Sequence, residues 1–140
     1  MLLSPRRFKY KKQQKGRSFN KINSNSKDQR SGLNFGSVGL KALSPGRLTA
    51  KQIQSVRQCI SKKIKKLGRV KVNIFPDTPI SKKPIEVRMG KGKGNVDHWV
   101  FKVKPGFILF EVETSSISTA IKALEAGQIR LPIKTKIILD

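Results

Sequence analysis

The chain has little of several residue types that most proteins of its size use. Its 140 residues include one cysteine, one histidine and eight acidic residues. The single cysteine, Cys59, excludes an internal disulfide and any multi-cysteine zinc site. Helical spacing places Cys59 on a packed or half-buried face, where a thiol behaves as a small hydrophobe. One histidine and one cysteine are too few for an ordinary metal site, so we expect no metal and no cofactor.

Long apolar runs and catalytic motifs are also missing. A membrane-spanning helix needs about 20 apolar residues, and the longest apolar stretch here is only a few residues. His98 lies beside Trp99 in a predicted strand, without a nucleophile elbow or a paired-carboxylate motif. Glu111 and Glu113 alternate along another predicted strand and are expected to face solvent. These absences argue against an enzyme.

What the chain does have is positive charge. Lys and Arg number 31, and the net charge is +23. Such self-repulsion opposes a compact state unless a polyanion neutralises it. The candidate polyanions are nucleic acid and an anionic membrane surface. Surface binding to a membrane would need a basic amphipathic helix with a free apolar face. The one candidate helix needs its apolar face for the core, so nucleic acid is favoured and no membrane partner is expected.

The charge is concentrated in the first half of the chain. Residues 1–76 contain 20 Lys or Arg and a single acid, whereas residues 77–140 contain 11 bases and seven acids. Residues 1–34 show almost no hydrophobic periodicity, and their ten bases are interleaved with aromatic residues. We therefore expect a basic arm over residues 1–34 that orders on RNA, followed by a single domain over residues 35–140. The alternative is a solvated tail without function.

The pattern from residue 49 predicts a helix with a basic face. Thr49 and Gln52 form a capping box, and Gly68 supplies a stop. The apolar stripe consists of Ile53, Val56, Ile60, Ile64 and Leu67. The opposite face carries Lys51, Arg57, Lys62, Lys63, Lys65 and Lys66. Soluble helices usually mix charge signs on their exposed face, so a face of one sign indicates contact with phosphate.

The remaining segments predict mostly strands. We expect strands over residues 69–75, 85–89, 97–103, 107–112 and 135–139, and a turn at residues 76–79. A second turn at residues 104–106 should join strands 97–103 and 107–112 into a hairpin. A second helix is expected over residues 118–130, burying Ile121, Leu124 and Ile129. Because helices and strands do not alternate regularly, the fold class is α+β, with two helices packed on a mostly antiparallel or mixed sheet.

The most distinctive motif is VRMGKGKGNV at Val87–Val96. Its glycines permit positive φ and a close approach of backbone N–H groups to an anion, and the flanking cations suit phosphate. The spacing does not fit an NTPase loop or a dinucleotide fingerprint, both of which lead into a helix. Two alternatives remain: a flexible glycine turn whose lysines face water, and the nucleotide loop of a free-standing nucleic-acid enzyme. Nucleotide binding by the isolated protein would identify the second.

In its context this motif closely resembles the large-subunit ribosomal protein L-sixteen family of bacteria and organelles. The resemblance covers nearly the whole chain, in order. The opening MLLSPRRFKYKKQQKGR, then FGSVGLKAL and GRLTAKQIQSVRQ, resemble the first segments of the family. The segment VNIFPDTPISKKPIEVRMGKGKGNVDHWVFKVKPGFILFEV resembles its central signature, and LPIKT its closing one.

The resemblance implies a hammerhead-type α+β fold and a structural role at the base of the central protuberance of the large subunit. It implies binding to large-subunit rRNA beside the A-site tRNA, contact with neighbouring ribosomal proteins, and late assembly; no homo-oligomer is implied. The loop reaching toward the peptidyl-transferase region would be Arg88, Met89, Gly90, Lys91, Gly92, Lys93 and Gly94. The basic residues threading into rRNA would be Arg6, Arg7, Lys9, Lys11, Lys12, Lys15 and Arg17.

One segment departs from the family pattern. Between KGR and LNFGSVGL the chain has a longer stretch, SFNKINSNSKDQRSG. This insert and the divergence from bacterial residues favour a mitochondrial ribosome, with a plastid or bacterial ribosome as the alternatives. The start matches the family without an added leader, which is consistent with synthesis inside the organelle.

Overall fold

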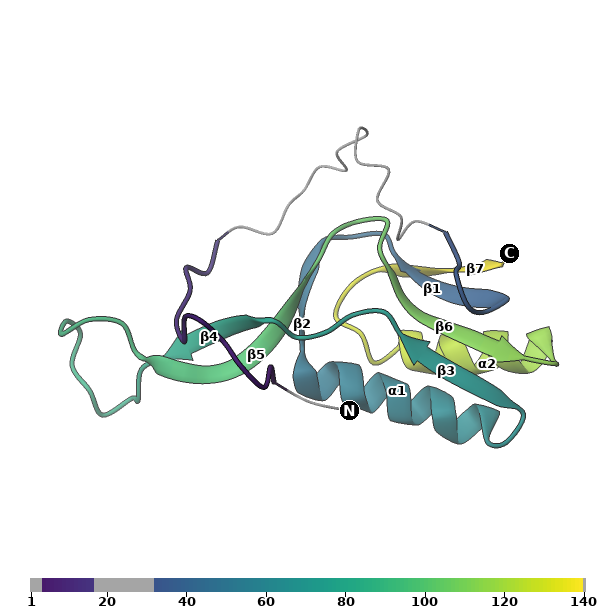
Figure 1. Ribbon diagram of the computed structural model, residues 1–140, viewed down its shortest axis with the longest axis horizontal. Helices are drawn as coiled ribbons and strands as arrows, with labels where there is room; N and C mark the ends of the chain where they lie inside the picture. Colours follow the sequence, from purple (N-terminus) through teal and green to yellow (C-terminus); the bar gives the residue numbers. More distant parts are fainter. Residues whose placement is uncertain (1–3, 17–31, 140) are drawn as a thin grey trace.

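The computed structural model describes residues 4–16 and 32–139. Two helices and seven strands follow one another along the chain (Figure 1). They are β1 Val38–Ala42, β2 Gly46–Thr49, α1 Ala50–Ile64, β3 Gly68–Val72, β4 Thr78–Lys82, β5 Asn95–Val103, β6 Ile108–Thr114, α2 Ile117–Gln128 and β7 Thr135–Leu139. The α+β class predicted from the sequence is confirmed.

The strands form two sheets, and every pairing is antiparallel. One sheet has four strands in the order β3-β6-β1-β7, and the other has three in the order β2-β5-β4. The two helices lie side by side along one face of the four-stranded sheet (Figure 1). The three-stranded sheet extends away from this packed part and ends in the loop between β4 and β5 (Figure 1).

The predicted hairpin between strands 97–103 and 107–112 is wrong. Both strands exist as β5 and β6, and the backbone does turn between them, where Phe107 N–H donates to Lys104 O at 3.3 Å. They do not pair, however, because each has both of its edges taken by other strands. β5 lies between β2 and β4, and β6 lies between β3 and β1. The two strands therefore diverge into different sheets.

Helix α1 begins as its sequence predicts and ends earlier. Thr49 Oγ1 accepts from Gln52 N–H at 3.2 Å, and Gln52 Oε1 accepts from Thr49 N–H at 2.9 Å, which completes the capping box. The helix ends at Ile64, since Lys65 adopts a positive φ of 53°. Leu67 therefore leaves the apolar stripe and is exposed, and Gly68 opens β3 instead of ending the helix.

Helix α2 packs on α1 through small residues. Ala120, Ala123, Leu124 and Gly127 are buried. A Cβ at Gly127 would lie 3.0–3.2 Å from side-chain atoms of α1, so glycine permits the close helix–helix approach. The prediction that Ile129 is buried is wrong: it follows the end of the helix and is 86% exposed.

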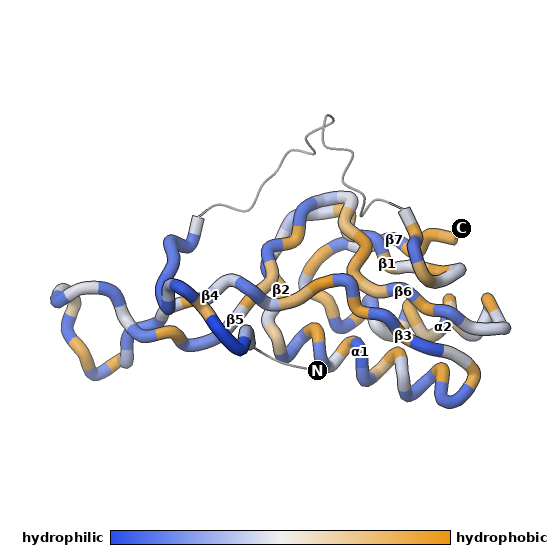
Figure 2. Tube along the Cα trace, viewed as in Figure 1, coloured by the Kyte–Doolittle hydropathy of each residue, from blue (hydrophilic) through white to orange (hydrophobic). Residues whose placement is uncertain are grey.

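The apolar core lies between the helices and the four-stranded sheet. Figure 2 shows hydrophobic residues gathered there, while the opposite end of the molecule is mostly hydrophilic. The largest fully buried apolar side chains are Phe110, Leu40, Leu48, Ile53, Ile60, Ile64, Ile108, Leu109 and Leu124. Cys59 is half-buried, as predicted, and its thiol lies 3.6 Å from Ala126 O.

A buried carboxylate ties the start of the domain to the sheet. Glu111 is 1% exposed, so the prediction that it faces solvent is wrong; Glu113, two residues on, is exposed as predicted. Glu111 accepts hydrogen bonds from Phe35 N–H at 2.7 Å, Asn34 N–H at 3.2 Å and Asn73 Nδ2 at 2.5 Å. Burial of a carboxylate is tolerable when several donors satisfy it, and alternation along a strand does not reveal such donors.

Candidate nucleic-acid interface

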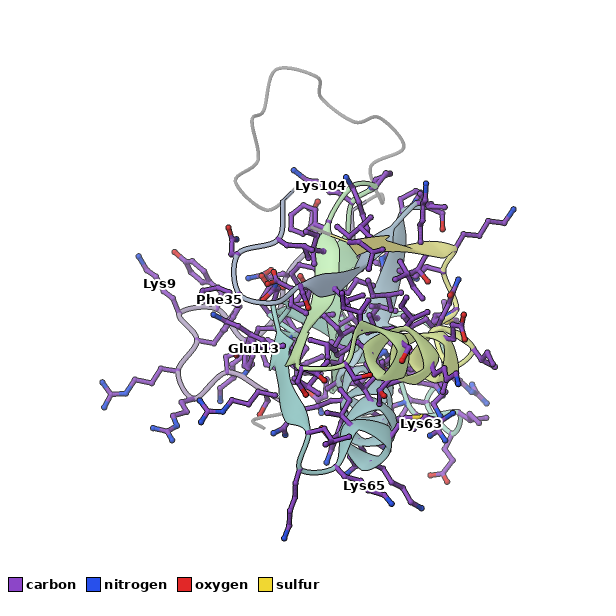
Figure 3. The ribbon with its side chains drawn as sticks, turned by 90° about the vertical axis from the view of Figure 1, so that its right-hand side faces the viewer. Lys9, Phe35, Lys63, Lys65, Lys104 and Glu113 are labelled. Carbon is purple, nitrogen blue, oxygen red and sulfur yellow. The ribbon has the colours of Figure 1, made fainter. Side chains whose placement is uncertain are left out.

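The basic face of α1 is present as predicted. All six predicted cations are exposed: Lys51, Arg57, Lys62 and Lys63 lie on α1, and Lys65 and Lys66 follow directly after its end. Figure 3 shows Lys63 and Lys65 projecting away from the core. Among the described residues, no carboxylate forms an ion pair with any of them. The face is therefore open to an anion along its length.

The glycine-rich segment forms an exposed loop between β4 and β5, at the far end of the molecule from α2 (Figure 1). Gly90, Lys91 and Gly92 all have positive φ, of 106°, 51° and 84°. A Cβ at Gly90 or Gly92 would meet nothing within 4 Å, so these glycines serve backbone conformation and not packing. The loop leads into β5 and not into a helix, which leaves the nucleotide-loop alternative without support.

The two ends of the loop, at Lys83 and at Lys93 and Gly94, form its stem. Backbone atoms approach each other more closely in the stem than at the tip. A Cβ at Gly94 would lie 2.6 Å from Lys82 O, so only glycine fits against the end of β4. The amine of Lys83 donates to Gly90 O, which ties the stem to the tip.

The predicted strand over residues 85–89 does not exist. This stretch is a turn followed by bends, and β4 forms instead at Thr78–Lys82, where the sequence indicated a turn. Residues 85–89 lie beyond Lys82, the last residue of β4 that pairs with β5, so no neighbouring strand is available to them. Ile85 and Met89 are consequently 96% and 94% exposed. The alternation of apolar and polar residues over 85–89 is typical of a strand, but this stretch has no strand to pair with.

The N-terminal arm, over its described residues 4–16, lies along the three-stranded sheet (Figure 1). Phe8 contacts Trp99 of β5 edge-to-face, with ring centroids 5.0 Å apart. Farther along, Arg47 Nη2 of β2 donates to Gly16 O at 2.6 Å and to Lys15 O at 3.4 Å. Side chains on the sheet thus hold the arm through its backbone and one aromatic ring.

The arm also contacts the stem of the loop. Lys12 Nζ donates to Lys93 O at 2.9 Å, and Lys93 Nζ donates to Gln13 O at 2.5 Å. These bonds bring together two of the basic groups predicted from the sequence, although about 80 residues separate them along the chain. The C-terminal end of α1 lies elsewhere, toward the opposite end of the long axis (Figure 1).

The cations of the arm are exposed, and among them Lys12 also donates to Lys93 O. Arg6, Arg7, Lys9, Lys11, Lys12 and Lys15 are exposed, and Figure 3 shows Lys9 projecting from the body. Arg17 and residues 18–31 of the insert lie outside the described residues. None of the six arm cations, and none of Arg88, Lys91 and Lys93, is ion-paired with a carboxylate in the described part of the chain.

One acid–base pair borders this surface. Asp97 Oδ2 and His98 Nδ1 lie 2.8 Å apart at the start of β5, and both side chains are largely exposed. The hydrogen bond from His98 lowers the pKa of Asp97, and the charges of His98, Lys82 and Lys51 lower it further. His98 is thus a surface imidazole.

Sequence reasoning missed the residues that join the arm to the body. Arg47 and Trp99 do this, yet neither was a predicted binding residue. A weak signal existed for Trp99, because a lone tryptophan on a strand with alternating apolar residues often packs against a neighbouring segment. Arg47 had no signal, since the β2 segment itself was not recognised as a strand.

Other kinds of site find no support. Within residues 4–16 and 32–139, no group of three His, Cys, Asp or Glu side chains is arranged to hold a metal ion. In the same described ranges no helix is long and apolar enough to cross a membrane.

The chain matches known proteins over nearly its whole length. The family model described as ribosomal protein L16p/L10e matches residues 5–138. The large ribosomal subunit protein uL16 of Maricaulis maris is 51% identical over 137 residues, which cover 98% of this chain and 96% of that protein. The uL16 proteins of Gluconobacter oxydans and Acidiphilium cryptum are 50% and 49% identical with the same coverage.

These matches include both basic elements that the fold brings together, the arm from residue 5 and the loop between β4 and β5. They confirm the family resemblance of the sequence motifs, and they point to a structural protein and not to an enzyme. The chain belongs to the ribosomal protein L16p/L10e family.

Proposed function

We propose that this ribosomal protein binds large-subunit rRNA as a structural constituent of the large subunit. The observation that carries the proposal is the shared position of the arm and the loop stem. Nine cations of the arm and loop, at residues 6–15 and 88–93, have no carboxylate ion-pair partner within the described ranges. Binding of phosphates to such a surface is favourable, because it neutralises the cations and releases counterions.

In this proposal the two parts of the surface have different tasks. The arm and the basic face of α1 neutralise rRNA phosphates, which positions the protein without reading sequence. The loop, with Arg88, Lys91 and Lys93, reaches beyond the rRNA contact toward the A-site tRNA near the peptidyl-transferase region. Its exposed Met89 and Ile85 then find apolar contact that the free protein does not provide. The folded core fixes the positions of both parts relative to each other. In this way it supports late assembly of the subunit.

The compartment and the stoichiometry are part of the same proposal. The insert between the arm and the domain favours a mitochondrial ribosome over a plastid or bacterial one. One copy per subunit, with rRNA and neighbouring ribosomal proteins as partners, agrees with a surface whose uniform positive charge would repel a second copy. Organelle fractionation followed by detection of the protein tests the compartment separately from the function.

Sedimentation of a gentle lysate tests the function. The protein should comigrate with large subunits and monosomes at moderate salt and be released as salt rises, because the contacts are electrostatic. The triple variant Arg88→Ala, Lys91→Ala, Lys93→Ala should fold normally but reduce large-subunit maturation or A-site tRNA binding. Replacing the exposed Lys122, Lys134 and Lys136 by alanine removes the same charge away from the loop and is the matched control. A protein found only in light fractions would overturn the proposal.

A further inference from the structure

A small cavity lies where the arm crosses the stem of the loop. It has a volume of about 220 Å³ and is lined by Gln13 and Lys15 of the arm, Ser81 and Lys83 near the end of β4, and Lys93 and Gly94 of the loop. Pockets for drug-sized ligands start at roughly 300 Å³. This cavity is therefore suited to a single small group and not to a whole nucleotide.

The residues that line the cavity carry positive charge, and no negative charge among them balances it. Three lysines contribute to it, and no carboxylate is among its lining residues. Two of the amines donate to backbone carbonyls, Lys93 to Gln13 O and Lys83 to Gly90 O. An ammonium group has three donors, so each retains donors for a further acceptor. The cavity thus concentrates donors and positive charge in one place.

One of the lining residues, Ser81, carries a buried hydroxyl without a hydrogen-bond partner in the described part of the chain. Ser81 Oγ is buried and makes no hydrogen bond in the described structure. The pairing of β4 with β5 shifts register between Ile80 and Ser81, so Ser81 follows an irregularity in the ladder. Buried hydroxyls are normally hydrogen-bonded, and an unsatisfied one costs free energy. An oxyanion in the cavity would accept this hydrogen bond.

We propose that this cavity binds one phosphate group, held by Ser81 Oγ and by the amines of Lys15, Lys83 and Lys93. A phosphate there would bridge residues from the arm, from β4 and from the loop. It would thereby fix the arm against the loop stem, which otherwise meet through the Lys12 and Lys93 hydrogen bonds. The group can come from an RNA backbone or from free phosphate. The first source rests on the proposed function, and the second does not.

Titration of the ¹⁵N-labelled full chain with inorganic phosphate, at an ionic strength held constant with sodium chloride, tests the site. Amide shifts of Gln13, Ser81 and Gly94 should change and saturate. The variant Ser81→Ala keeps the charge and removes only an unsatisfied hydroxyl, so it should fold normally. It should bind phosphate about tenfold more weakly, the effect of losing one hydrogen bond to a charged group. Lys15→Ala should weaken binding as well.

Ser115→Ala, an exposed serine outside the cavity, and Lys136→Ala on β7 are the controls and should match the wild type. Shifts that grow without saturating, or an unchanged affinity in Ser81→Ala, would overturn the site. A short single-stranded RNA that displaces inorganic phosphate identifies the nucleic acid as the source. If it does not displace phosphate, the site stands with free phosphate as its ligand. Comigration with large subunits is scored separately, so failure of the cavity and failure of the proposed function are distinguishable.

Discussion

The two ends of the molecule use their side chains in opposite ways. At one end, α1 and α2 cover the four-stranded sheet, and Phe110 at its centre is fully buried. At the other end, the three-stranded sheet carries the arm and a loop in which Met89 is 94% exposed. A chain with a modest apolar fraction builds one well-packed end. The other end presents cations and exposed apolar groups that only a partner can satisfy.

The largest expected effect is the difference in unfolding free energy between a variant of the packed end and a variant of the loop end. Phe110→Ala should lower the free energy of unfolding by about 3–5 kcal/mol, because it leaves a cavity in the core. Met89→Ala removes an equally apolar side chain from the loop and should change it by less than about 0.5 kcal/mol. Urea unfolding followed by circular dichroism measures both. Similar losses in the two variants would show that the loop is packed as tightly as the core.

A smaller effect is expected at the buried carboxylate. Glu111→Gln keeps the size of the side chain. It removes the negative charge and replaces one of the two oxygens, which together accept three hydrogen bonds, by an NH₂ group that cannot accept. It should cost about 2 kcal/mol, within the range for hydrogen bonds to charged groups. Glu113→Gln makes the same change on an exposed side chain of the same strand and should be close to neutral. Equal stability of the two variants in urea would show that the three donors near Glu111 contribute nothing.

Much of the packed end could be predicted from the sequence, because local patterns determine it. The capping box at Thr49, the stripe through Ile53 to Ile64 and the final strand over residues 135–139 match the structure. The end of α1 could not be predicted, since a stripe that continued to Leu67 concealed the positive φ of Lys65. The location of Glu111 in the core depends on donors from Asn34, Phe35 and Asn73, which lie 77, 76 and 38 residues away from it in the sequence.

The other end was less predictable because distant segments build it. β2 and β4 are short and flank β5, so strands 97–103 and 107–112 looked like a hairpin when their partners were unknown. The cations of the arm and of the loop were each predicted as binding residues from composition and glycine spacing. Their meeting at Lys12, Gln13 and Lys93 depends on tertiary contacts between segments about 80 residues apart, which no local pattern encodes.

The smallest expected effect lies at the border of the basic surface. His98→Ala should raise the pKa of Asp97 toward its ordinary value of 3.8, because the hydrogen bond from His98 is the main cause of the lowered pKa. Lys82→Ala should raise it less. Since the folded-state pKa lies below the unfolded one, the pair stabilises the fold above pH 3.8, and this contribution is lost as pH falls through the folded-state pKa. An NMR titration of the Asp97 carboxyl checks the order of the two variants.

The most direct test of the account is the salt dependence of rRNA binding. The affinity of the wild type for a large-subunit rRNA fragment should fall linearly with salt on a log–log plot. Replacing Arg6, Arg7 and Lys9 of the arm by alanine should reduce the slope by about 2, since each phosphate contact to single-stranded RNA contributes about 0.7. The matched variant at Lys122, Lys134 and Lys136 should keep the wild-type slope. An affinity indifferent to salt, or equal slopes for all three proteins, would contradict the account.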